Sequence, residues 1–298
     1  MQYELITILG PTASGKTRLA VQLAAQLDAE IISADSRQVY RGMNLGTGKD
    51  LEEYRIGDRE VPYHLIDIVN AGDSYHIFQF QKDFQKVFND IRNRGKIAIL
   101  CGGSGLYLEA VLRGFQYTAV PIDEELRTVL LTLSQEELLK RFESLSSFVP
   151  KADTSTHKRT IRAIEIGEYL KTHPEFELPQ QQTINSIIFG LNPPLELRRE
   201  KITTRLHQRL EQGMVEEVKA LLSAGVSSDK LIFYGLEYKW ITEYLQGTID
   251  YQTMFDRLNV AIHQFAKRQM TYFRKMEKEG LIINWLEVEP FTQIQEFL

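Results

Sequence analysis

An α/β fold, with a parallel sheet flanked by helices, is predicted by three observations. Short apolar runs alternate with helical patterns through the first hundred residues, which is typical of parallel strands joined by helices. A glycine-rich turn directly follows the first apolar run. Beyond Gly114 the strand pattern stops, and helical periodicity continues until an apolar run resumes near residue 184. We therefore expect an α/β core formed by 1–115 and 183–298, interrupted by a helical insertion at 116–182.

The individual elements follow from apolar runs and from helical spacing. The expected elements are strands at 5–9, 31–33, 63–68, 97–101, 184–191 and 281–286, and helices at 16–27 and 77–94. The helix at 77–94 is the clearest, because phenylalanines recur at helical spacing from Phe80 to Phe88 and Gly95 follows where a C-cap glycine belongs. Within the insertion, Ser134 and Glu137 match a capping box, which predicts the start of a helix.

Composition excludes several classes of protein. The chain has 298 residues, of which 43% are hydrophobic and 25% charged, so a packed core is expected and disorder is excluded as the main state. No run of about 18 apolar residues is present, and the start MQYELITILG lacks the pattern of a signal peptide. The single cysteine, Cys101, fits a reducing compartment. We therefore expect a cytoplasmic protein with no membrane partner.

A phosphate-binding loop (P-loop) is predicted directly after the first strand. Eight consecutive residues match the pattern G-x-x-x-x-G-K-[ST]: Gly10, Pro11, Thr12, Ala13, Ser14, Gly15, Lys16 and Thr17. The motif lies between an apolar strand and a helix, where backbone N–H groups and the positive end of the helix can bind phosphate oxygens. Lys16 is placed to contact the outer phosphates, and the Thr17 hydroxyl to ligate Mg²⁺. The motif predicts binding of a di- or triphosphate without specifying a reaction.

A carboxylate that holds Mg²⁺ usually lies at the end of an apolar strand in this class. Asp35 follows Ile31–Ser33, and Asp67 ends the run His64–Asp67, so both are candidates. Their spacing does not decide between them. From the residues alone, the chain is therefore either a kinase-like enzyme or another transferase that handles a diphosphate.

Further motifs are more specific than the phosphate-binding loop. In chain order they are ISADSRQVYRGMNLGTGK at 32–49, PYHLIDI at 62–68, GGSGLYL at 102–108, KRTIRAIEI at 158–166 and FAKRQMTYF at 265–273. Together with GPTASGKT, these blocks resemble the tRNA dimethylallyltransferase (tRNA isopentenyltransferase) family over nearly the whole chain. The resemblance implies transfer of a dimethylallyl group from dimethylallyl diphosphate to N6 of adenosine 37 in the anticodon loop of tRNA. It also implies Mg²⁺ and an adenine that leaves its stack, and we expect a monomer.

The resemblance assigns chemical roles to four residues. Asp35 corresponds to the carboxylate that accepts the N6 proton as a general base. Lys16 and Thr17, with the metal ion, would neutralise the leaving diphosphate held by the loop. Arg209, four residues after Arg205 on one helical face, resembles the arginine that stabilises the diphosphate. The structural alternatives are an Asp35 that only caps a helix and an Arg209 on a solvated face.

Contacts to tRNA are implied for residues in several parts of the chain. They are Asp35, Ser36, Arg37, Gln38, Ser104, Arg127, Lys158, Arg159, Thr160, Ile161, Arg162, Gln264, Lys267 and Arg268. Gln38 is expected to read the polar edge of the adenine, and the insertion to bind the anticodon stem. The alternative for the basic residues is a solvated helix face. Phe265 and Phe273 fit core packing better than base stacking.

The chain departs from the usual family pattern at a few positions. Ser104 stands where threonine is usual, which keeps the hydroxyl but not the methyl group. Gly48 and Asp50 replace the usual alanine and proline of a GTAKP block, and Ile262-His263 replaces Thr-Arg before the AKRQ motif. The stretch FYGLEYK at 233–239 only approximates a GYKE-type tRNA contact. These departures concern tRNA binding more than the chemistry.

The net charge of −5 argues against a wholly basic nucleic-acid binder, but the charges are unevenly distributed. The stretch 194–210 has five basic and two acidic residues, and 263–278 has five basic and one acidic. Since local patches govern contact with phosphates, we expect basic helices that face RNA and tRNA binding that weakens as salt rises.

Three alternatives to a tRNA-modifying enzyme remain open. Prenylation of free AMP, ADP or ATP keeps the chemistry and changes the acceptor, although the basic helices favour a larger RNA. A P-loop small-molecule kinase would leave the ADSRQVY block unexplained. A non-catalytic RNA-binding module would bind tRNA without turnover.

Overall fold

The computed structural model describes residues 3–180, 183–287 and 290–297. The chain forms two compact units, the first made of Met1–Arg113 and Thr183–Leu298 and the second of Gly114–Gln182. The second unit spans the helical insertion expected at 116–182. Among the described residues, no helix has both the length and the apolar character needed to cross a membrane.

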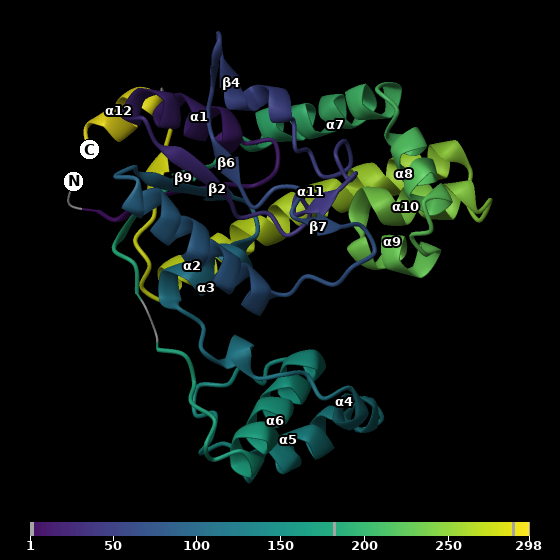
Figure 1. The fold of residues 1–298 in the computed structure, drawn as a ribbon. Helices are drawn as coiled ribbons and strands as arrows, with labels where there is room; N and C mark the ends of the chain where they lie inside the picture. The colour runs from purple at the N-terminus through teal and green to yellow at the C-terminus, as the bar shows by residue number, and fades with distance from the viewer. Residues whose placement is uncertain (1–2, 181–182, 288–289, 298) are drawn as a thin grey trace. The chain divides into compact units, whose positions relative to one another are not determined.

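A parallel sheet, six-stranded over the described residues, lies at the centre of the first unit (Figure 1). Its order is β10 (Asn284–Leu286), β9 (Ser186–Leu191), β1 (Leu5–Leu9), β8 (Ala98–Gly102), β2 (Glu30–Ser33) and β6 (Tyr63–His64). All neighbouring strands are parallel, and Leu5 pairs with Ala98 on one side and Ser186 on the other. Because the carboxyl ends of β1, β2 and β8 meet at one edge, the loops that follow them lie together.

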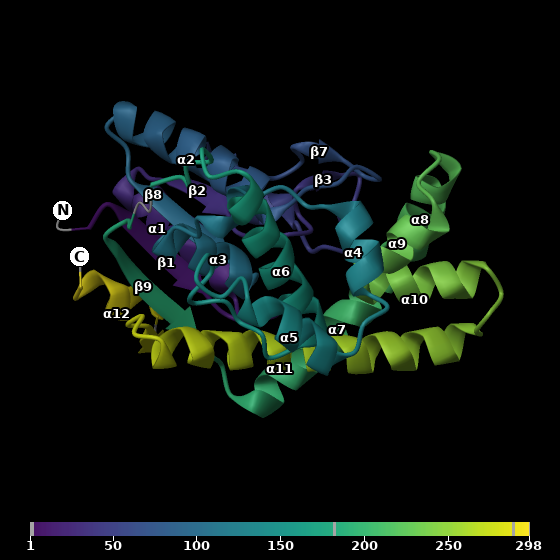
Figure 2. The same cartoon turned by 90° about the horizontal axis from the view of Figure 1, so that it is seen from below.

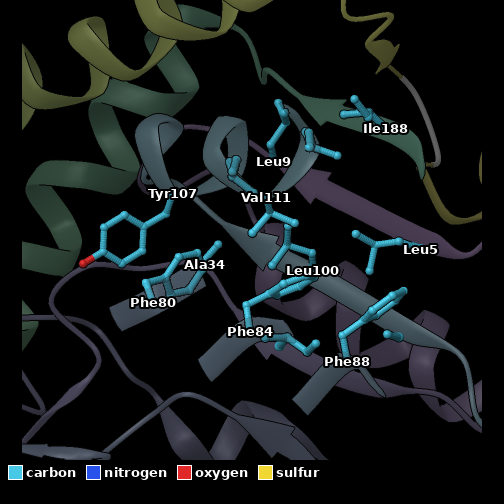
Figure 3. Close-up of a cluster of buried hydrophobic side chains, with 14 of the residues drawn as sticks. Leu5, Leu9, Ala34, Phe80, Phe84, Phe88, Leu100, Tyr107, Val111 and Ile188 are labelled. Carbon is cyan, nitrogen blue, oxygen red and sulfur yellow. The ribbon is translucent and has the colours of Figure 1, made fainter. Parts of the chain in front are cut away.

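Two apolar clusters cover the two faces of this sheet. The helices of the first unit are α1 (Lys16–Leu27), α2 (Ile77–Asn93), α3 (Gly105–Arg113), α7 (Leu195–Glu211), α8 (Met214–Ser223), α9 (Ser228–Tyr234), α10 (Leu236–Leu245), α11 (Tyr251–Lys278) and α12 (Pro290–Gln295). Leu5 and Leu9 of β1 face α2 and α3, where phenylalanines of α2 pack against the strands (Figure 3). Ile6 and Ile8 face α1 and α12 on the opposite side.

A third apolar cluster holds the helices beyond the sheet together. Buried Tyr238, Met254 and Leu258 lie at its centre, with contributions from α7 to α11. α10 and α11 lie side by side (Figure 2). Shorter elements complete the unit: the strand pairs β3 (Tyr40–Arg41) with β7 (Val69–Asn70) and β4 (Arg55–Ile56) with β5 (Arg59–Glu60), and the 3₁₀ helix η1 (Leu51–Tyr54).

The structure confirms the predicted fold class and most of the predicted elements. The strand at 5–9 and the helix at 16–27 have the predicted bounds, and α2 ends one residue before the predicted end, with Gly95 just beyond. The strand predicted at 63–68 is wrong after His64. Leu65 and Asp67 have φ of 62° and 55°, so the chain leaves the extended conformation there.

The second unit is a small helical bundle with its own core. Its helices are α4 (Glu124–Leu130), α5 (Gln135–Glu143) and α6 (His157–Thr172), preceded by the 3₁₀ helix η2 (Tyr117–Ala119). The predicted capping box is confirmed, because the Ser134 hydroxyl accepts from the Glu137 N–H while the Glu137 carboxylate accepts from the Ser134 N–H. Leu138 and Ile164 are buried where α5 packs against α6.

Candidate active site

The phosphate-binding loop at 10–17 joins β1 to α1, as predicted. Gly15 has φ 85°, where a side chain would strain the backbone. Within the described part of the chain, α1 begins at Lys16 with no side-chain cap and no acidic residue in its first turn. Its first N–H groups are therefore open to an anion, and the helix dipole adds partial positive charge there. This backbone is suited to bind phosphate.

Gln269 of α11 fixes the position of this loop, a role the sequence did not reveal. Its Oε1 accepts a hydrogen bond from Thr12 N at 2.8 Å, and its Nε2 donates to Gly103 O at 2.9 Å. The side chain is buried. One amide thus connects the loop after β1 to the loop after β8, and the long helix α11 holds both.

Asp35 lies just after β2 and lines the same cavity as Lys16 and Thr17. Its Oδ1 accepts hydrogen bonds from the N–H groups of Arg37 at 2.9 Å and Gln38 at 3.4 Å. This is a turn rather than the helix cap considered as the alternative. Among the described residues no donor contacts Oδ2, so that oxygen is available to a substrate.

Burial shifts the pKa values of two groups that line the cavity, Lys16 and Cys101. It lowers the pKa of the Lys16 ammonium, while the Asp35 carboxylate raises it. Burial also raises the pKa of the Cys101 thiol to about 12, so this side chain is neutral. An arriving phosphate would favour the charged form of Lys16 in the same way as Asp35 does.

The residues that follow Asp35 are connected to the neighbouring loops. The Ser36 N–H donates to Ser104 Oγ at 3.0 Å, so the serine that replaces threonine keeps a structural role for its hydroxyl. Gln38 Oε1 accepts from Ser33 Oγ at 3.0 Å, and its Nε2 donates to Gly48 O at 3.1 Å. The protein thus already contacts both ends of the Gln38 amide. Its predicted contact with adenine would use the remaining lone pair or proton.

Arg205 and Arg209 of α7 reach the cavity together and share one carboxylate. Both guanidinium groups pair with Asp50, with Arg209 Nη2 at 3.1 and 3.0 Å from its two oxygens. Burial and the adjacent Arg209 lower the pKa of Arg205, and Asp50 opposes this effect. We call Arg205, Arg209 and Asp50 the cavity cluster.

The cavity enclosed by these loops and helices has a volume of about 550 Å³. Its wall includes predicted residues from the first unit: Thr12, Lys16, Thr17, Asp35, Ser36, Arg37, Gln38, Ser104, Arg209 and Arg268. Aromatic side chains also contribute, with Phe233 largely exposed and Arg37 lying 5.4 Å above the ring of Tyr234. The wall therefore combines cationic, acidic and aromatic groups, as binding of a phosphate and a flat base requires.

Other predicted residues of α11 lie at or beyond the edge of this cavity. Gln264 and Lys267 are exposed and are not part of the wall. Phe273 is fully buried, as predicted. The prediction of a core position is wrong for Phe265, which is only partly buried and lines the cavity, because α11 turns that side toward the loops.

In the second unit, two of the predicted tRNA-contacting arginines share a fully buried carboxylate. Glu165 Oε2 accepts from Arg127 at 2.7 Å and from Arg162 at 3.3 Å. Arg162 also donates to the carbonyl of Val120 at 2.6 Å. We call Arg127, Arg162 and Glu165 the insertion cluster; it holds α4 and the segment before it against α6.

The remaining predicted residues of α6 differ in exposure. Lys158 and Arg159 are exposed, and Arg159 pairs with Asp153 at 2.7 Å. Thr160 and Ile161 are buried in the interior of the unit, so their side chains do not reach the surface. Helical spacing explains this, since the positions that follow Arg159 rotate onto the inner face.

The structure distinguishes the two carboxylates, Asp35 and Asp67, that the sequence offers as metal ligands. Asp67 pairs with the buried Lys49 and does not line the cavity. Asp35 and Thr17 both line it. No group of three or more His, Cys, Asp or Glu side chains that could hold a metal ion occurs among the described residues. A hydroxyl and a carboxylate beside a diphosphate fit Mg²⁺, which takes substrate oxygens and waters as most of its ligands.

Glu237 is a wall residue that the sequence did not identify. It lies in the first turn of α10, beside Arg205 and Arg209. Burial raises the pKa of its carboxyl group to about 7, although both arginines act in the opposite direction. The signal in the sequence is the stretch 233–239, which resembles a GYKE-type tRNA contact only approximately.

The parallel sheet, the loop at 10–17 and the basic cavity define a P-loop protein with a site for a phosphorylated substrate. The sequence profile of the IPP transferase family matches residues 38–276. The chain is 55% identical to tRNA dimethylallyltransferase 2 of Bacteroides fragilis, over 96% of this chain and 93% of that protein. The chain therefore belongs to the IPP transferase family.

Solved structures agree with this assignment. The crystal structure of tRNA isopentenylpyrophosphate transferase from Bacillus halodurans matches with a TM-score of 0.69 and 32% identity, over 99% of this chain and 94% of that chain. A eukaryotic dimethylallyltransferase acting on tRNA matches with a TM-score of 0.76 over 97% of this chain and 75% of that chain. At 21% identity, the second likeness concerns the fold alone.

Proposed function

We propose that this protein transfers a dimethylallyl group from dimethylallyl diphosphate to N6 of adenosine 37 in tRNA and releases diphosphate. Family membership and the names of its relatives support the reaction. The observation that carries the proposal is one cavity lined by Asp35, Lys16 and residues of the phosphate-binding loop. A base and an anion site thus face the same space.

The chemistry follows from these positions. The exocyclic amine of adenine is a weak nucleophile, because its lone pair is delocalised into the ring. As the N6–C1 bond forms and the C1–O bond of the prenyl diphosphate breaks, Asp35 Oδ2 accepts the N6 proton. Lys16, the N–H groups at the start of α1 and Arg209 would stabilise the negative charge that builds up on the leaving diphosphate. Mg²⁺, with the Thr17 hydroxyl as a ligand, would supply further positive charge.

The wider assignments belong to the same proposal. The proposal includes the monomer expected from the family resemblance and a location in the cytoplasm, with which the single buried Cys101 is compatible. The exposed Lys158 and Arg159, together with Gln264, Lys267 and Arg268, would contact the tRNA backbone. The aromatic groups of the wall would stack on an adenine that has left its helix.

The test is an incubation of the protein with dimethylallyl diphosphate, Mg²⁺ and unmodified tRNA, with AMP and ATP as parallel acceptors. Nucleoside analysis by mass spectrometry should find prenylated adenosine at position 37, and replacement of that adenosine by guanosine should abolish the product. Faster turnover of free AMP or ATP than of tRNA would instead favour a nucleotide prenyltransferase. Absence of product with every tRNA would contradict the proposal.

A further inference from the structure

The cavity cluster brings two like charges together at the wall of the cavity. The Arg209 side chain is only 11% exposed, and Arg205 lies four residues away on the same face of α7. Two adjacent guanidinium groups that are partly removed from water require a nearby anion. In this structure the anion is the carboxylate of Asp50, which pairs with both.

The backbone around Asp50 is shaped to make these contacts. Asp50 has φ 40° and ψ 54°, a left-handed conformation that costs a non-glycine residue roughly 1 kcal/mol. It occupies the N-cap position of η1 and, within the described chain, its side chain does not cap that helix. Gly48, at φ 65°, brings the backbone close to the pair, because a Cβ at this position would meet the guanidinium groups of Arg205 and Arg209 and these would have to shift.

The segments on either side restrict how this loop can move. Lys49 is buried, and its Nζ donates to Tyr40 O at 2.6 Å and to Asn44 Oδ1 at 3.0 Å. Asp50 itself is one-third exposed, so its side chain has access to solvent. A rotation of the Asp50 side chain can therefore free the arginines while Lys49 keeps the loop in place.

We propose that Asp50 is an internal counterion that occupies the arginine pair until a substrate diphosphate displaces it, and that it weakens the binding of diphosphate. A diphosphate carries more negative charge than one carboxylate and can accept hydrogen bonds from both guanidinium groups. The phosphate-binding loop and Lys16 on the same wall select this ligand over a simple anion. The inference rests on the proposed function only in taking a diphosphate as the ligand.

The exchange has a consequence for the product as well. When diphosphate leaves, Asp50 can pair again with Arg205 and Arg209, so the empty site does not leave two unpaired cations. This competition would favour product release. The carbonyl of Gly48 accepts a hydrogen bond from Gln38, whose N–H contacts Asp35. The exchange therefore occurs beside the part of the cavity where the proposed base lies.

The experiment is a calorimetric titration of inorganic pyrophosphate, with Mg²⁺ present, into the parent protein and Asp50→Asn. Asparagine keeps the size of the side chain and tolerates a positive φ, so the loop should keep its shape. The variant should bind pyrophosphate about 3- to 5-fold more tightly, the upper part of the scale of one partly exposed charge pair. The matched control is Asp58→Asn, which removes the same charge from the exposed β4–β5 turn and should change affinity less than about 2-fold.

Steady-state kinetics provide a second test, because a purely structural role of Asp50 would not change the KM values selectively. Asp50→Asn should lower the KM for dimethylallyl diphosphate and strengthen inhibition by pyrophosphate, while the KM for tRNA stays unchanged. Equal or weaker pyrophosphate binding by a folded Asp50→Asn protein would overturn the counterion role and leave the proposed reaction intact. If neither parent nor variant binds pyrophosphate, the inference fails together with the diphosphate site of the proposed function.

Discussion

Two clusters in this protein have the same composition, two arginines on one carboxylate, but different surroundings. They are the cavity cluster (Arg205, Arg209 and Asp50) and the insertion cluster (Arg127, Arg162 and Glu165). The Glu165 side chain is 0% exposed, and Arg162 also contacts backbone carbonyls. The Asp50 side chain is 34% exposed, and both of its arginine partners line a cavity of about 550 Å³. The carboxylate of the insertion cluster is inaccessible to solvent and stabilises its unit, whereas the carboxylate of the cavity cluster can be exchanged for another anion.

The largest expected effect lies in the cavity, where activity should be lost without loss of stability. Asp35→Asn keeps an acceptor for the Arg37 and Gln38 N–H groups but removes the base. Turnover should fall by roughly 10²–10⁴, the usual scale for loss of a general base. The measurement is single-turnover prenylation, together with tRNA binding and the melting temperature, which should change little. Parent-like turnover would remove Asp35 from the role of base.

The opposite result, lost stability, is expected in the insertion cluster. Glu165→Gln removes the buried charge that faces Arg127 and Arg162 and should destabilise the second unit by about 1.5–3 kcal/mol. Hydrogen exchange of the α6 amides is the suitable measurement. Tryptophan fluorescence would not report on the second unit, because both tryptophans, Trp240 and Trp285, lie in the first unit. Glu168→Gln, which breaks a half-buried pair with Arg141, is the control and should cost less than about 1 kcal/mol.

The arginines themselves provide a matched pair of substitutions. Arg209→Met should weaken pyrophosphate binding about 10- to 100-fold, since a charge-assisted contact contributes about 1.5–3 kcal/mol. Arg127→Met should leave this affinity unchanged within about 2-fold, because its charge pairs with Glu165 in the other unit. Both affinities can be measured by calorimetry under the same conditions. A comparable loss in the two variants would contradict the division of roles.

The smallest expected effect concerns pH and Glu237. Its carboxyl group has a pKa of about 7 in the folded protein against an ordinary value of 4.5, so the folded state binds an extra proton between these values. The contribution of this group to stability therefore falls as pH rises from about 4.5 to about 7. Glu237→Gln does not titrate, so its melting temperature relative to the parent should increase across this window and then level off.

The control for this pH effect is Glu216→Gln, at an exposed position of α8. Its difference in melting temperature from the parent should not follow the same pH course. A constant difference for Glu237→Gln between pH 5 and 8 would show that burial does not raise the pKa of Glu237.

Predictions from sequence succeeded where the signal is local. The strand, loop and helix around Lys16 follow from adjacent residues, because the motif specifies its own backbone and its own helix start. Periodicity located α2 and spacing located the capping box of α5 for the same reason. The strand expected at 63–68 was wrong in its second half, because left-handed conformations at Leu65 and Asp67 have no signature in an apolar run.

Contacts between distant residues could not be predicted in this way. Gln269 is 257 residues from Thr12, yet it fixes the phosphate-binding loop. Asp50 meets Arg205 across 155 residues, and the sequence showed only an unusual aspartate in a family motif. Arg127 matched a position that contacts tRNA, but its partner in the structure is the buried Glu165.

The sequence by itself determined the fold class and the phosphate-binding loop, because both depend on the pattern of neighbouring residues, while the family resemblance indicated Asp35 as the candidate base. The tertiary structure decided which charges are available for chemistry. Solvent access and pairing depend on how helices pack: the carboxylate that pairs with two arginines is fully buried in α6 and one-third exposed beside α7. Packing also selected Asp35 over Asp67 as the carboxylate of the cavity, since the loop after β2 lines the cavity with Lys16, whereas Asp67, beyond β6, pairs with Lys49.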